Sequence, residues 1–95
     1  MKNVDLNYKP REMSFPYKTI SALFWYGELK NENLRNAIQI EKYVTSPEWR
    51  DRAEYYFNNT LIPRLIKKGV IRRTKWGYYD LTPEWRKQYK NQLPC

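Results

Sequence analysis

The residues with the most evident chemistry are basic, and they are concentrated in the last third of the chain. Residues 64–90 contain nine Lys or Arg against two acidic residues, whereas residues 1–63 contain nine against eight. Solubilising surfaces usually mix both signs, so an excess confined to one segment favours a polyanionic partner. The alternative is a basic face that only keeps the protein in solution.

The sequence offers few residues for catalysis, metal binding or phosphate binding. The chain has no histidine and a single cysteine, which excludes histidine-based nucleophile activation and a cysteine or histidine metal site. The three glycines are isolated, so no glycine-rich loop could cradle a phosphate. The carboxylates of Glu28, Asp51 and Glu54 show no pairing that would mark an acid and a base. We therefore expect no enzyme, no metal and no cofactor.

Length and composition favour one small globular protein. A chain of 95 residues with 41% hydrophobic side chains can bury one modest core. A single cysteine favours a reducing compartment, and the chain has no apolar run long enough for a signal peptide or a membrane span. We expect a soluble cytoplasmic protein, with residues 1–16 as a polar N-terminal arm, or simply disordered, and residues 17–95 as the domain.

The first half of that domain is predicted to be helical. Ile20, Leu23 and Phe24 give residues 17–26 one apolar face, and Gly27 is typical of a helix end. Residues 28–30 form a short extended link. A second helix follows, capped by Asn31 or Asn33 and running to about Val44.

Residues 47–68 allow two interpretations. Ser46 followed by Pro47 predicts a helix start. Pro63 would remove a hydrogen bond from a helix interior, which favours one helix to about Phe57, a break at Asn58 and Asn59, and a new helix from Thr60. The alternative is one kinked helix.

A β-hairpin and a last helix complete the predicted order. Residues 70–74 and 78–81 are β-prone and flank a tight connection at 75–77, with Tyr79 and Leu81 on one face. Thr82 is expected to cap a helix through about Lys90, with Trp85 and Tyr89 packing on the core. The fold class is therefore mainly α with a small β-hairpin (α+β), in the order of a winged helix-turn-helix, which places the helix before the hairpin to enter a major groove.

Two short motifs carry a family resemblance. Residues 65–71 (LIKKGVI) resemble the end of a recognition helix entering the wing, and residues 76–84 (WGYYDLTPE) resemble the wing turn and its exit. From about Thr60 to Tyr89 the chain is similar to the N-terminal winged-helix domain of Mrr-type restriction proteins and to small phage and bacterial regulators. The resemblance implies a DNA-binding module without catalytic residues.

The predicted function is double-stranded DNA binding, as a transcriptional regulator or a phage or mobile-element accessory factor. A homodimer through the first helix, the arm or the last helix would supply enough contact area for a specific site. The alternative is a protein-interaction module, inhibitor or adaptor on the same scaffold. The candidate DNA contacts are Asn58, Asn59, Thr60, Arg64, Lys67, Lys68, Arg72, Arg73, Lys75 and Trp76.

Several of these residues have a second interpretation. Asn58 and Asn59 suit a turn better than a base contact. The hairpin arginines could instead protect an exposed edge strand from aggregation, and Arg86, Lys87 and Lys90 could extend the basic surface or only solvate the last helix. Trp76 could pack back on the hairpin or stack on a base or sugar. The other tryptophans, Trp25, Trp49 and Trp85, are expected in the core.

Overall fold

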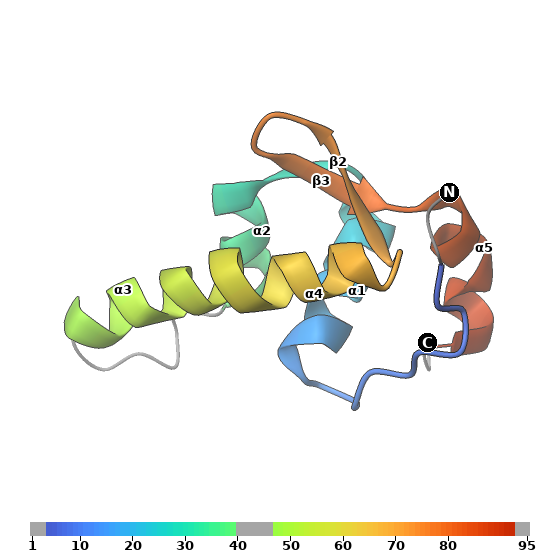
Figure 1. Cartoon of the computed structure of the whole chain (residues 1–95), viewed down its shortest axis with the longest axis horizontal. Coiled ribbons are helices and arrows are strands. Elements are labelled where there is room, and N and C mark those ends of the chain that lie inside the picture. The colour runs from blue at the N-terminus through green and yellow to red at the C-terminus, as the bar shows by residue number, and fades with distance from the viewer. Residues whose placement is uncertain (1–3, 40–46, 93–95) are drawn as a thin grey trace.

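The structure, a computed structural model, describes residues 4–39 and 47–92, in which helices surround a small antiparallel sheet (Figure 1). Helix α1 (Phe15–Tyr26) begins two residues earlier than predicted, because Ser14 is its cap and accepts a hydrogen bond from the Tyr17 N–H at 3.3 Å. It ends as predicted at Gly27, whose φ of 78° is costly for other residues.

Helix α2 (Asn31–Ile38) is shorter than predicted. Gln39 adopts the left-handed conformation and its N–H bonds back to Arg35 and Asn36, which closes the helix well before Val44. The predicted cap by Asn31 or Asn33 is also wrong, because Lys30 occupies the capping position without a side-chain hydrogen bond. Residues 40–46, including Val44, lie outside the described residues.

The next segment is one continuous helical rod (Figure 1), so of the two interpretations the break at Asn58 and Asn59 is wrong and the alternative of a single helix is confirmed. It comprises α3 (Pro47–Tyr56), a π-helical turn η2 (Phe57–Leu61) and α4 (Ile62–Lys67). In the π turn the Ile62 N–H donates to the carbonyl of Phe57, five residues back. This wider turn lets Pro63 follow without the missing donor and the ring clash that interrupt an ordinary helix.

The sheet has three strands in the order β1-β3-β2 (β1, Leu29–Lys30; β2, Ile71–Lys75; β3, Tyr78–Leu81). The hairpin prediction is confirmed, and Gly77 takes a φ of 79° in its turn. The predicted link at residues 28–30 contributes β1, which pairs with β3. Thr74 is an extra residue in β2, because Arg73 lies opposite Tyr79 and Lys75 lies opposite Tyr78.

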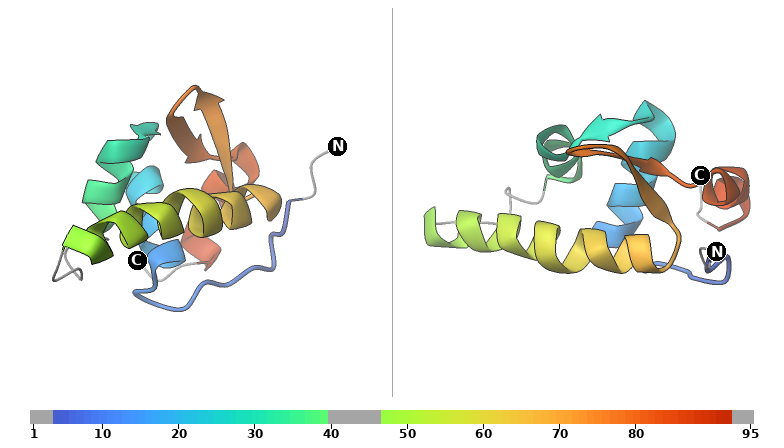
Figure 2. Two further views of the ribbon diagram at one scale, coloured as in Figure 1. Left: turned by 60° about the vertical axis from the view of Figure 1, so that its left-hand side comes forward. Right: turned by 45° about the horizontal axis from the view of Figure 1, so that its top comes forward.

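Helix α5 (Pro83–Gln92) packs its predicted face on the core. Trp85 and Tyr89 are buried, as are Tyr79 and Leu81 on the sheet. Thr82 directly precedes α5, as predicted, and its carbonyl accepts from the Arg86 N–H at 3.0 Å. Its hydroxyl donates to the Gly69 carbonyl at 2.7 Å and so ties the start of α5 to the end of α4. Figure 2 shows α5 at the end of the molecule away from α3.

The N-terminal arm packs against this end of the molecule from Val4 onward. The Asp5 N–H donates to the Lys68 carbonyl at 2.7 Å, and the Trp85 indole N–H donates to the Asp5 carbonyl at 3.1 Å. The ring of Tyr8 lies edge-on to Trp85, with 6.2 Å between centroids. Simple disorder, the alternative interpretation of the arm, is therefore wrong for its described part.

Candidate nucleic-acid interface

The first group of candidate residues lies on the outer side of α4. Leu61 and Leu65 are buried, and the helical spacing then leaves Arg64 and Lys67 exposed, with Lys68 half-buried after them. No described residue forms an ion pair with Arg64 or Lys67. These two cations are free to meet an anion.

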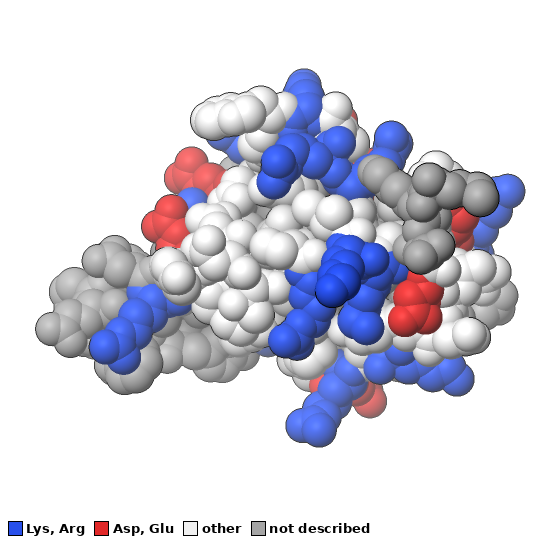
Figure 3. All heavy atoms as spheres, viewed as in Figure 1, with Lys and Arg blue, Asp and Glu red and all other residues white. Residues whose placement is uncertain are grey.

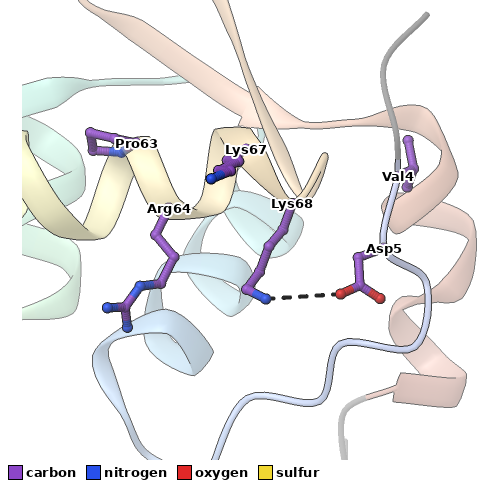
Figure 4. A pocket seen from close by; sticks show the side chains of 6 residues that line it. All are labelled: Val4, Asp5, Pro63, Arg64, Lys67 and Lys68. Atoms are coloured by element: carbon purple, nitrogen blue, oxygen red, sulfur yellow. Dashed lines mark ion pairs between the residues drawn. The ribbon is translucent and has the colours of Figure 1, made fainter.

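The same side chains line an open pocket of about 630 Å³ between α4 and the arm. Figure 4 shows Lys68 extending toward Asp5 of the arm, whereas Arg64 extends from α4 away from Asp5. The Lys68 ammonium lies 3.9 Å from the Asp5 carboxylate and 4.7 Å from the centre of the Tyr8 ring. Burial raises the pKa of Tyr8, an effect that the positive charge of Arg64 partly offsets. The pocket holds three cations and one carboxylate, so it remains basic.

The hairpin carries the second group, and the predicted cluster is divided between the two faces of the ribbon. Arg72 pairs with Asp80 and Arg73 with Tyr79, so their side chains point to opposite faces. The extra residue in β2 places Lys75 beside Tyr78, with its ammonium 4.4 Å from the ring centre and 3.7 Å from Glu28. Arg73 lies over Tyr79 at 5.8 Å.

At the tip of the hairpin, Trp76 is almost fully exposed. Its exposed fraction is 93%, the largest among the exposed large hydrophobic residues of the described chain, and it does not pack back on the ribbon. The core placement predicted for Trp85 is confirmed. That for Trp25 is wrong, since it is 68% exposed on α1. The side chain of Trp49 is outside the described set.

Asn58, Asn59 and Thr60 lie in the π turn rather than in a loop. Asn58 Oδ1 accepts a hydrogen bond from Asn31 Nδ2 at 2.8 Å, and Asn59 Nδ2 donates to the Tyr55 carbonyl at 3.0 Å. Recognition of adenine by asparagine needs the amide oxygen and nitrogen together. These internal bonds indicate that both asparagines fix the π turn, although it is a helical turn and not the loop turn that we predicted.

One predicted surface cation, Arg86, is half-buried and bonded within the fold. Arg86 donates to Asp80 Oδ1 at 2.6 Å and to the carbonyls of Leu23 and Phe24 at 3.3 Å each. It therefore satisfies the C-terminal end of α1, where cations interact favourably with the helix dipole. Both interpretations from the sequence missed these internal partners of Arg86, although part of its side chain does remain exposed.

Cations of the hairpin and of α4 are visible together on one face of the molecule, and further Lys and Arg atoms lie around its edge (Figure 3). Figure 3 shows Lys and Arg atoms over the hairpin and over the C-terminal part of α4, with neutral surface between the two groups. The segment from Arg64 to Lys75, which we call the basic segment, contains six cations and no carboxylate. Sequence reasoning missed Asp5, because nothing in its neighbourhood signals that the arm returns to α4.

The chain matches no protein-family model, no curated protein and no solved structure. Within residues 4–39 and 47–92, no three His, Cys, Asp or Glu side chains come together as a possible metal site. No helix in those ranges is long and apolar enough to cross a membrane. The fold and the basic surface must therefore carry the functional argument.

Proposed function

We propose that the chain is a winged-helix protein that binds double-stranded DNA, as a transcriptional regulator or a phage or mobile-element accessory factor. The element order supports this class, since α1, β1 and α2 precede a long helix that leads directly into the hairpin. The pairing of β1 with β3 attaches the hairpin to the helical core. In this arrangement the helix before the hairpin would enter the major groove of DNA, and the hairpin would lie along the sugar-phosphate backbone.

The observation that carries the proposal is the basic segment itself. Its cations come from the last turns of α4 and from β2, and both elements present positive charge on the face shown in Figure 3, although Arg72 and Arg73 point to opposite faces of the ribbon. Lysine and arginine that lie beside one another in this way suit successive phosphates of a duplex. With both asparagines engaged inside the chain, phosphate contact and DNA shape are the better-supported means of recognition.

Salt dependence tests the proposal directly. About five phosphate contacts predict that the logarithm of the affinity for a duplex falls with the logarithm of salt concentration with a slope of about −4 to −5. The double variant K67E/R73E should reduce the slope by about 2 and weaken binding at least about tenfold at moderate salt. Lys87→Glu, an exposed lysine of α5, is the matched control and should change affinity by less than about twofold.

Fluorescence anisotropy with a labelled duplex gives both quantities. A logarithmic loss of affinity in the control of about half that in the double variant, in proportion to the one charge reversed against two, would show that only net charge matters. An absence of duplex affinity at low salt would overturn the proposal and favour the protein-interaction alternative.

The homodimer remains part of the proposal. The arm and α5 already pack within the chain, which leaves the outer side of α1 as the better-supported contact. Trp25 and Tyr26 are exposed there, and Trp25 lines a shallow pocket with Met13 and Ala37. Light scattering should give twice the chain mass for the native protein and the chain mass for Trp25→Glu; a monomeric native protein would exclude the dimer.

A further inference from the structure

A second cavity, of about 440 Å³, lies between the hairpin tip and the start of α2. Trp76, Arg73 and Tyr79 line it from the hairpin, and Lys30, Arg35 and one carboxylate, Glu32, line it from the other side, so three cations face one acidic group. Its volume falls within the range of about 300–1,000 Å³ that small-molecule sites occupy. An exposed indole and several basic side chains therefore line the same cavity.

The walls of this cavity are held by hydrogen bonds. The Asn31 N–H donates to the Gly77 carbonyl at 2.8 Å, which ties the hairpin turn to the start of α2. Arg35 Nε donates to Asn31 Oδ1 at 2.9 Å, and its guanidinium lies 3.7 Å from Glu54. The site is thus formed before any ligand arrives, which reduces the entropy lost on binding.

Trp76 has no structural role that would explain its position. An indole exposed to 93% buries almost none of its apolar surface in the fold. A flat π system that carries a negative charge would cover the indole and meet the cations Arg73 and Lys30 at once. A nucleotide has both properties, and stacking of a base on an aromatic side chain tolerates any base.

We propose that this cavity binds one unpaired nucleobase, stacked on Trp76, at a single-stranded end of a duplex held by the basic segment. The inference rests on the proposed function, since the basic segment supplies the duplex contact. It adds that the protein distinguishes DNA with an unpaired end from fully paired DNA. A free mononucleotide would offer the same base and phosphate without the duplex contact.

The test compares labelled duplexes that differ only at the end, by fluorescence anisotropy on the full chain. A blunt duplex, the same duplex with a short 3′ overhang and the same duplex with a 5′ overhang are the probes. We expect at least one overhang to raise the affinity about tenfold over the blunt duplex, in keeping with the stacking of one base. Trp76→Ala should remove this difference, Trp76→Phe should keep part of it, and Tyr55→Ala, an exposed aromatic of α3, should leave it unchanged.

The outcomes separate this inference from the proposed function. Duplex binding with no preference for an overhang overturns the inference and leaves the function standing, as does a preference that survives in Trp76→Ala. Trp76-dependent binding of a single strand, without affinity for the blunt duplex, overturns the proposed function and, with it, the inference that the base lies at the end of a bound duplex. A mononucleotide that competes as well as the overhang duplex at equal concentration identifies a free-nucleotide site and also overturns the inference.

Discussion

Thr82 and Thr74 offer a paired test of how this small core is held together. The Thr82 hydroxyl is buried and donates to the Gly69 carbonyl, which is itself buried. Thr82→Val keeps the shape but leaves that carbonyl without its partner, so the free energy of unfolding should fall by about 1–2 kcal/mol. Thr74 Oγ1 is also buried but has no hydrogen-bond partner among the described residues. Thr74→Val therefore removes an unfavourable group, and stability should stay the same or rise by about 1 kcal/mol.

Thermal unfolding followed by circular dichroism resolves changes of this size. In a domain of about 100 residues, 1 kcal/mol corresponds to about 4–8 °C in Tm, so Thr82→Val should lower Tm by about 5–15 °C. The two substitutions are chemically identical and lie in neighbouring parts of the chain, so each controls for the other. Equal destabilisation by both would refute the reasoning, because it would mean that side-chain shape decides the outcome rather than hydrogen bonding.

Three further predictions concern stability. Leu65→Ala removes a fully buried side chain of α4 and should cost about 2–5 kcal/mol in urea unfolding, whereas a loss below about 1 kcal/mol would contradict its place in the core. Gly77→Ala meets no atom within 4 Å but keeps a φ of 79°, so only backbone strain of about 1–2 kcal/mol should appear; an unchanged urea midpoint would show that the turn relaxes. Because burial raises the pKa of Tyr8 above 10.0, folding favours the protonated phenol. The stabilisation by the protonated Tyr8 phenol is present below pH 10.0 and is lost as pH rises through the pKa of the folded state. In the native protein the urea midpoint should therefore fall above pH 10.0, and Tyr8→Phe should make this fall smaller. An unaltered pH profile in Tyr8→Phe would exclude the titration of Tyr8 as its cause.

Local patterns in the sequence were sufficient to predict the position of most helices and strands. Gly27 and the turn at Gly77 define boundaries because a positive φ is cheap only for glycine. Alternation placed Tyr79 and Leu81 on the buried face of the sheet, and helical spacing did the same for Trp85. These features depend on neighbours in the chain, so the sequence pattern contains them.

The predictions failed where a local conformation or the burial of a side chain depends on residues distant in the sequence. Pro63 suggested a break, but the π turn absorbs it, and Asn58 is held there by Asn31 from another helix. Arg86 was predicted to be a surface charge, but Asp80 and the carbonyls at the end of α1, which are distant in the sequence, bind its guanidinium. The division of Arg72 and Arg73 between the faces of the ribbon does follow from strand geometry, and period-two alternation could have predicted it.

The π turn also sets the rotational phase of the long rod. An α-helix advances about 100° per residue, and a π turn amounts to one inserted residue. Everything after Leu61 is therefore turned by about 100° relative to an uninterrupted continuation of α3. Deleting one residue from η2 should convert it to an ordinary α turn and leave Leu65 facing the interior, whereas the full sequence wound as a plain α-helix would turn Leu65 outward and Arg64 and Lys67 to a different side of the rod. The winding of this one turn, π or α, therefore decides which side chains of α4 face the interior and which face solvent.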